Sequence, residues 1–290
     1  VGGVLQASCQ IVIANTPCVA DFECMETGAT YQNPVTATNR NPLYTKLVNT
    51  GFRFDVLALQ SSGALASSYA GNVVVELYDK SAAASCAAAT PIISQNLSFV
   101  AGDNGRKTIA AEMLLPDAYK NLACRVRESS GSTPVSACSS DSFSVRPTQF
   151  NSVTSNANAD NAGNSPTSTP FIAAGANFVL TANTGVKGYD GIPKIDPSLL
   201  QWPNVPSVID GGRPAPGTGN LSGVFTVAAN PLNGNGATGN AFQYDEVGYF
   251  RLRPQAVYDD TFVSTSGSAD VANSDCTDDT SNTLVGGKYG

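Results

Sequence analysis

Short runs of alternating apolar and polar residues recur along most of this 290-residue chain, and this two-residue period constrains its fold more than any other feature. In residues 72–78 the valines at alternate positions and Leu77 share one side, whereas Glu76 lies on the other. A β-strand places alternate side chains on opposite faces, and a helix would scatter them around its axis. The pattern predicts strands that bury one face and expose the other.

The same alternation predicts further strands in both halves, separated by Gly, Pro and Asn clusters that favour turns. There is no convincing helix, although residues 108–115 and 116–121 have room for a helical turn or two. The predicted fold class is therefore all-β with antiparallel sheets. The further strands are predicted at residues 52–59, 124–127, 143–146, 177–181, 223–227, 240–244 and 248–253.

A domain boundary is predicted near residue 147. One strand is expected to end at Arg146, and Pro147 follows where strand pairing must stop. Residues 151–170 are rich in Asn, Ser, Asp and Thr, which is typical of a linker. We therefore predict two tandem β-sandwich domains, residues 1–147 and 148–290, with immunoglobulin-like topology favoured over a barrel.

Seven cysteines indicate an oxidising compartment, because so many thiols would be reactive in a reducing cytosol. We expect one disulfide within the first three cysteines and one within the next three, which leaves a thiol of the second group able to reach back to the first. The connectivity stays open. The odd count suggests a partner outside these 290 residues for one cysteine. In chain order the cysteines are Cys9, Cys18, Cys24, Cys86, Cys124, Cys138 and Cys276.

The net charge of −7 argues against nucleic acid and anionic membranes as partners, since both bind basic surfaces. Acidic residues predominate in the second half. No stretch approaches the roughly 20 apolar residues of a membrane-spanning helix, so we expect no membrane insertion. The expected location is extracellular, reached with a signal peptide that has been removed.

The chain contains no histidine. This removes Ser-His-Asp and Cys-His catalytic sites and histidine-based zinc sites. Paired carboxylates could still act on glycans, and the candidates are Asp245, Glu246, Asp259 and Asp260. Because acidic residues are common in turns, the preferred interpretation is a protein that is not an enzyme and has no catalytic cofactor.

Calcium is the candidate cation, because clustered side-chain oxygens suit a hard ion and the second half supplies several in turn-like segments. The residues proposed for it are Asp190, Asp196, Asp259 and Asp260. Asx-turns and solvated loops explain the same residues without a metal. If calcium stabilises the fold, chelation lowers the melting temperature.

Two binding alternatives depend on exposed features. An unpaired strand such as residues 10–14 could insert into a neighbouring subunit and build an extracellular filament by β-strand addition. Exposed aromatic side chains could instead bind surface glycans, with Trp202, Tyr189 and Tyr249 as candidates.

Several segments of the sequence resemble the large uncharacterised extracellular domain of MshQ-like proteins. These proteins belong to biogenesis clusters of type IV pili of the mannose-sensitive haemagglutinin (MSHA) kind. The resemblance covers nearly the whole chain, and its most specific segment ends in Phe143-Ser-Val-Arg-Pro147. Others are Phe22-Glu-Cys-Met-Glu26, Cys124-Arg-Val-Arg127, Glu246-Val-Gly-Tyr-Phe-Arg251 and Gly286-Gly-Lys-Tyr-Gly290.

The resemblance implies a long, secreted surface protein of a Gram-negative bacterium. It also implies that the chain continues past Gly290 into a cysteine that pairs with Cys276. No catalytic residues of the family carry over. The expected function is a non-catalytic structural or adhesion module, whose partners are other pilus or cell-surface proteins, further copies of the chain, or surface glycans.

Overall fold

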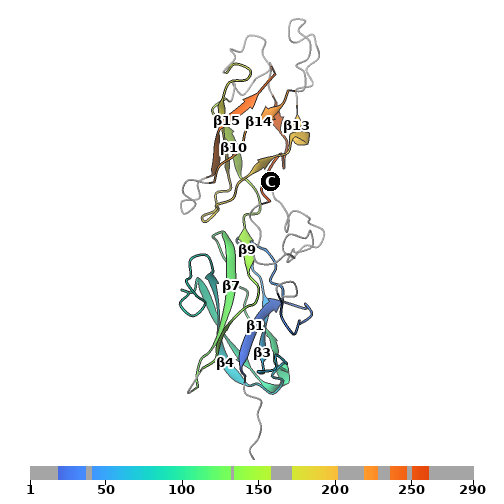
Figure 1. Cartoon of the computed structure of the whole chain (residues 1–290), viewed down its shortest axis with the longest axis vertical. Coiled ribbons are helices and arrows are strands. Elements are labelled where there is room, and N and C mark those ends of the chain that lie inside the picture. Colours follow the sequence, from blue (N-terminus) through green and yellow to red (C-terminus); the bar gives the residue numbers. More distant parts are fainter. Residues whose placement is uncertain are drawn as a thin grey trace, which may run out of the picture.

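The computed structural model describes residues 19–36, 41–131, 134–157, 172–201, 219–227, 236–246 and 250–260. Figure 1 shows two groups of strands that lie end to end along the long axis of the molecule. We call strands β1 to β9 the N-terminal sandwich and strands β10 to β17 the C-terminal sheets. In the described part of the chain the regular structure is strand, apart from two short 3-10 turns, so the all-β fold is confirmed.

The N-terminal sandwich consists of two sheets. One has the order β1-β3-β6, and the other has the order β2-β9-β7-β4-β5, with β8 also paired to β7. All of these pairs are antiparallel except β2 with β9. The strands are β1 (Asp21–Glu26), β2 (Lys46–Leu47), β3 (Phe54–Leu59), β4 (Gly71–Asp79), β5 (Ile93–Phe99), β6 (Arg106–Thr108), β7 (Tyr119–Glu128), β8 (Ser136–Cys138) and β9 (Phe143–Arg146).

The strand order of the N-terminal sandwich is that of an immunoglobulin-like fold. In such a fold strands A, B and E belong to one sheet, and strands G, F and C belong to the other. Here β1, β3 and β6 take the places of A, B and E, whereas β9, β7 and β4 take those of G, F and C. The predicted topology is therefore confirmed for this part of the chain.

Apolar side chains of the two sheets meet and form one buried core. Val73, Val75 and Leu77 of β4 lie in it, as their alternation predicts. Burying an aliphatic side chain of this size contributes about 1.5–3 kcal/mol to stability, so the core is the main source of stability in the N-terminal sandwich.

The outer faces of both sheets are covered more than the alternation predicts. β3 is buried along its whole length, because Leu57 and Leu59 pack on its outer side with Met25. Glu76 of β4 was expected to face solvent, and it is buried as well. The prediction of a solvent-exposed face is therefore wrong for these strands, since segments distant in sequence fold over them.

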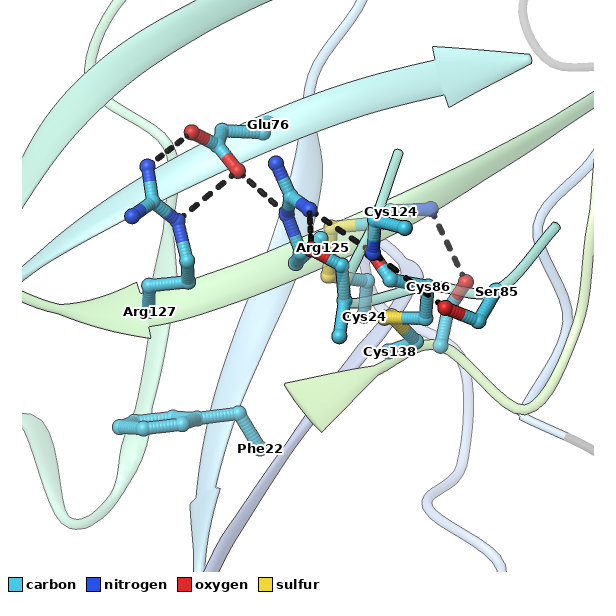
Figure 2. Close-up of a disulfide and its surroundings, with 12 residues drawn as sticks. Phe22, Cys24, Glu76, Ser85, Cys86, Cys124, Arg125, Arg127 and Cys138 are labelled. Carbon is cyan, nitrogen blue, oxygen red and sulfur yellow. Dashed lines mark hydrogen bonds and ion pairs between the residues drawn. A yellow bond between two sulfur atoms is a disulfide. The ribbon is translucent and has the colours of Figure 1, made fainter. Parts of the chain in front are cut away.

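Two disulfides cross-link the N-terminal sandwich (Figure 2). Cys24 of β1 is bonded to Cys124 of β7, which joins the two sheets through the core, with Cα atoms 6.2 Å apart. Cys86 is bonded to Cys138 of β8, with Cα atoms 6.3 Å apart. The bridge within the second group of cysteines and the thiol that reaches back to the first are confirmed. Because Cys24 is the cysteine it reaches, the bridge expected within the first group stays a prediction for Cys9 and Cys18. The cysteines outside the described residues are Cys9, Cys18 and Cys276.

The C-terminal sheets are antiparallel and have a core of their own, in which Phe178, Phe225 and Phe242 are buried. The largest sheet has the order β10-β11-β15-β14, and two smaller ones pair β12 with β17 and β13 with β16. The strands are β10 (Ser152–Ser155), β11 (Phe178–Asn183), β12 (Lys194–Ile195), β13 (Leu200–Gln201), β14 (Leu221–Ser222), β15 (Ala237–Tyr244), β16 (Arg251–Leu252) and β17 (Val257–Tyr258).

The strand predicted to end at Arg146 does end there, as β9. The linker assignment is wrong at Ser152–Ser155, which form β10 because Val153 packs against the second core. The division into two tandem domains stays a prediction.

Three local predictions are also wrong. Residues 108–115 and 116–121 hold no helical turn, and β7 already begins at Tyr119. Residues 223–227 follow β14 without forming a regular strand.

Among the described residues, no helix is long and apolar enough to cross a membrane.

Candidate functional site

The N-terminal sandwich and the C-terminal sheets meet at a junction built around Tyr189. This side chain follows β11 in sequence, yet it is fully buried in the core of the N-terminal sandwich. Its ring packs edge-on against Phe150 at a centroid distance of 5.9 Å, and Phe150 contacts both apolar cores. The Tyr189 hydroxyl donates a 2.5 Å hydrogen bond to the buried carboxylate of Asp259, which follows β17. Tyr189 therefore links the two groups of strands.

The prediction that Tyr189 is an exposed glycan-binding aromatic is wrong, since the side chain has no exposed surface. A local signal for its position is the preceding Gly188. This glycine has a φ of 78°, and a Cβ atom there would collide with the backbone of Ala118. The other two candidate aromatics, Trp202 and Tyr249, lie outside the described residues.

Polar contacts with the start of β7 complete the junction. The Ala118 N–H donates to the carbonyl of Lys187 at 2.7 Å. Lys120 donates to the backbone carbonyl of Asp190 at 2.8 Å, and its ammonium group lies 3.0 Å from the Asp190 carboxylate. Because both side chains are partly exposed, this ion pair contributes at most about 1 kcal/mol. Burial of Tyr189 is therefore the larger contribution.

Three of the aspartates proposed for calcium have protein partners in this region. Asp190 and Asp259 take part in the junction itself. Asp260 forms an ion pair of 2.7 Å with Lys194 of β12. The hydrogen bond to Asp260 raises the pKa of the Lys194 ammonium group. These carboxylates therefore have structural roles without a metal.

The fourth aspartate, Asp196, begins a 3-10 turn (Pro197–Leu199). Its carboxylate accepts hydrogen bonds from the backbone N–H and from the hydroxyl of Ser198. Across the residues that the structure describes, no three Asp, Glu or Cys side chains gather as ligands of one metal ion. Calcium binding stays a prediction, and a fall in melting temperature on chelation remains its test.

Asp245, a candidate for paired-carboxylate chemistry, also has a structural role. It accepts a 2.6 Å hydrogen bond from the backbone N–H of Asn220 and a 3.0 Å bond from the Asn220 side-chain amide. The backbone hydrogen bond, followed by the side-chain one, lowers the pKa of Asp245. A general acid in glycoside hydrolysis needs a raised pKa, so the geometry favours a connecting role for this carboxylate.

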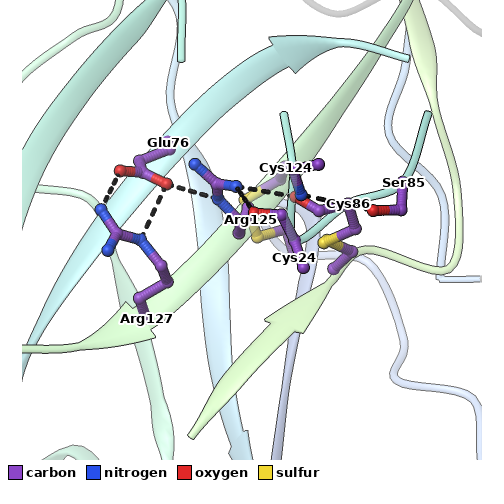
Figure 3. Close-up of polar contacts among 10 residues, drawn as sticks. Cys24, Glu76, Ser85, Cys86, Cys124, Arg125 and Arg127 are labelled. Carbon is purple, nitrogen blue, oxygen red and sulfur yellow. Dashed lines mark hydrogen bonds and ion pairs between the residues drawn. A yellow bond between two sulfur atoms is a disulfide. The ribbon is translucent and has the colours of Figure 1, made fainter. Parts of the chain in front are cut away.

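A buried polar cluster lies on the outer face of the larger sheet (Figure 3). Glu76 of β4 is held between Arg125 and Arg127 of β7. Burial raises the pKa of Glu76, but hydrogen bonds from the two guanidinium groups outweigh this effect and the pKa lies below its usual value. Arg125 also donates to the Cys86 carbonyl at 2.7 Å. Together with the Cys86–Cys138 bridge, it holds the β4–β5 loop on the sheet.

Glu23 of β1 is a second buried carboxylate with a different environment. It accepts hydrogen bonds from the backbone N–H of Ser140 at 2.8 Å, from that of Cys24 at 3.0 Å and from the Asn41 amide at 3.1 Å. Burial is the largest effect on this group and raises its pKa. Two of the partners lie 18 and 117 positions away in sequence, so local patterns could not reveal this site.

These features define a disulfide-bonded all-β protein that contains a β-sandwich. No family model and no curated protein sequence matches the chain. The calcium-binding domain CBD12 of CALX1.1 is similar at 16% identity over 73% of this chain and 79% of that chain, with a TM-score of 0.20. The native conformation of E. coli alpha-2-macroglobulin is similar at 10% identity over 82% of this chain and 14% of that chain, also with a TM-score of 0.20. Similarities this low assign no ligand to the chain.

Proposed function

We propose that this chain is a non-catalytic structural or adhesion module of an extracellular protein that works with type IV pili of the MSHA kind. The observation that supports it most is the junction, where Tyr189 is buried in one group of strands and bonded to Asp259 of the other. The two groups lie end to end (Figure 1). A connected, elongated body of this kind suits a protein that holds binding parts away from the cell.

The disulfides support a location outside the cytoplasm. Disulfides form and persist in oxidising compartments and are rare in the cytosol. One bridge joins the two sheets of the N-terminal sandwich, and the other fixes a loop on its surface. We place the protein at the bacterial cell surface, where such cross-links protect an extended module.

The acidic residues support a role without catalysis. Asp259 accepts the hydrogen bond of Tyr189, and Asp245 accepts hydrogen bonds from the backbone N–H and the side-chain amide of Asn220. The chain has no histidine to transfer protons near neutral pH. These carboxylates therefore serve as connectors in the proposed function.

Gold-labelled antibody on intact cells, with a second label on the pili, tests the proposed location. We expect labelling of cells that have not been permeabilised, beside or on the pili. A strain that lacks the full-length protein should attach poorly, and the full-length gene should restore attachment. Labelling only after permeabilisation, or normal attachment without the protein, would contradict the proposal.

A matched variant tests the absence of catalysis. The full-length protein with Asp245→Asn should restore attachment as well as the parent protein, because an amide can keep an acceptor for the exposed Asn220 N–H. Loss of attachment with an unchanged melting temperature would indicate that the carboxylate has a chemical role.

A further inference from the structure

The edge strand β5 is the most open strand edge of the N-terminal sandwich. β5 is the last strand of its sheet, and β4 is its only strand partner among the described residues. The pairing runs without a bulge from Gly71 opposite Phe99 to Leu77 opposite Ile93. A regular strand of seven residues therefore ends the sheet, and no other described strand pairs with its second edge, although the Gln95 side chain is hydrogen-bonded to the backbone of Ala111.

β5 lacks the features that usually protect such an edge. Proteins block edge strands with charged side chains, proline, bulges or short length. β5 reads Ile-Ser-Gln-Asn-Leu-Ser-Phe and has neither a charge nor a proline. The other edges of the same sandwich are protected: β1 carries three acidic residues, β2 has two residues, β8 has three, and β6 has three with Arg106 and Lys107 among them.

Two exposed apolar residues flank the strand. Ile92, just before β5, is 37% exposed, and Val100, just after it, is 56% exposed. Val100 has an extended backbone with φ −123° and ψ 157°. Both residues stand at even positions with the exposed Ser94, Asn96 and Ser98, so an extended chain places all five on one side.

We propose that two copies of this chain pair antiparallel along β5, with Asn96 at the two-fold axis. In that register Ile92 of one copy lies opposite Val100 of the other, because both are four residues from Asn96. Ser94 likewise lies opposite Ser98. The two exposed apolar side chains thus cover each other at both ends of the shared sheet, and Pro91 ends the pairing segment.

Charge makes β5 a better place for self-pairing than the acidic edge at β1. Each chain has a net charge of −7, so two copies repel each other over most of their surface. β5 has no ionisable side chain, and the two-fold pairing brings no like charges directly opposite each other. A second copy therefore fits this edge better than the acidic edge at β1. The inference is independent of the association with pili.

Sedimentation velocity of the intact chain over a range of concentrations tests the proposal. We expect a reversible dimer in the parent protein. Asn96→Lys places two ammonium groups together at the axis and should raise the dimer dissociation constant about ten-fold or more. The matched control is Asn72→Lys, which makes the same change on the same outer face, one strand further in, at a residue bonded to Ser98. It should leave the constant nearly unchanged.

A cysteine variant tests the register directly. Residues directly opposite each other in an antiparallel pair have Cα atoms about 4.5–5.5 Å apart, within the range that a disulfide spans. In a background with Cys9, Cys18 and Cys276 replaced by Ser, Asn96→Cys should therefore form a cross-linked dimer on oxidation, whereas the background alone and the background with Asn72→Cys should not. A parent that stays monomeric at the highest concentration, equal effects of the two lysine variants, or equal cross-linking of the two cysteine variants would overturn the proposal.

Discussion

At the scale of single residues, Tyr189 and Asp259 form the most consequential contact. Both groups are buried, so the hydroxyl and the carboxylate depend on each other for hydrogen bonding. A buried polar group that loses its partner pays its full desolvation cost. The stability of the junction should therefore respond strongly to small changes at this pair.

Tyr189→Phe removes only the hydroxyl and should lower the free energy of unfolding by about 1–3 kcal/mol, because Asp259 loses a buried donor. Urea unfolding measures this change. The matched control is Tyr119→Phe, since the half-buried Tyr119 hydroxyl has no hydrogen-bond partner within the described ranges. Equal effects of the two variants would show that the hydrogen bond to Asp259 does not matter.

The lowered pKa of Glu76 leads us to expect a loss of stability in acid. Its pKa in the folded protein lies below the ordinary value of 4.5, so its ionised form stabilises the fold above that pH, and this stabilisation is lost as the pH falls through the folded pKa. Glu76→Gln should cost about 3 kcal/mol at neutral pH, because Arg125 is left buried without its carboxylate. It should also flatten the acid limb of a stability–pH curve. The exposed Glu112, changed to Gln, should do neither.

For Glu23 we expect the opposite pH dependence of stability. Its pKa in the folded protein lies above the ordinary value of 4.5, so its contribution is most favourable below that pH and is lost as the pH rises through the folded pKa. The stability of the parent relative to Glu23→Gln should therefore fall as the pH rises from acid to neutral. Urea unfolding at a series of pH values measures the difference. A slope of the same sign as that for Glu76→Gln would contradict the assignment.

At the scale of strands and loops, the alternation of apolar and polar residues predicted where the strands lie better than it predicted which side chains are covered. The strand over residues 72–78 was predicted with the correct buried face, and β7 includes the predicted residues 124–127. The exposure of Glu76 was predicted wrongly because the β4–β5 loop covers it, held by contacts that no local pattern encodes. Local periodicity reports which side meets the core, but not which distant segment covers the other side.

The candidate sites show the same limit. Asp190, Asp196, Asp259 and Asp260 were singled out as calcium ligands, and each has a protein partner in the structure. Their partners Lys120, Tyr189 and Lys194 could not be predicted, because two of them join residues 70 positions apart. Composition identified acidic turns, and only the folded chain shows what each carboxylate binds.

The two disulfides should differ in their effects. Replacing Cys24 and Cys124 by Ala removes a cross-link between residues 100 positions apart and leaves a gap in the core. The free energy of unfolding should therefore fall by about 5 kcal/mol. Replacing Cys86 and Cys138 by Ala removes a cross-link at the surface between residues 52 positions apart. The free energy of unfolding should then fall by about 3–4 kcal/mol. Guanidinium unfolding of both double variants measures the order. A larger loss in the second variant would contradict the role of the first bridge in the core.

At the scale of the whole molecule, the described chain is an elongated body with two apolar cores and one junction between them. Each part has its own core, and the two disulfides cross-link the N-terminal sandwich, whereas Tyr189 and the contacts of Lys120 hold the parts together. Pairing along β5 would leave the junction free, because, among the described residues, the exposed β5 residues Ser94, Asn96 and Ser98 make none of the junction contacts. Display at the cell surface and self-association are therefore compatible.

Small-angle X-ray scattering of the intact chain, at concentrations where it is monomeric, tests the central claim that Tyr189 makes the two groups of strands one rigid body. We expect a single elongated particle whose profile is the same at low and high salt, since burial and not surface charge holds the junction. Tyr189→Ala should give a broader distribution of interatomic distances, as expected for two parts joined by a hinge. A parent profile that already fits a hinged ensemble, unchanged by Tyr189→Ala, would show that Tyr189 does not hold the two groups of strands together.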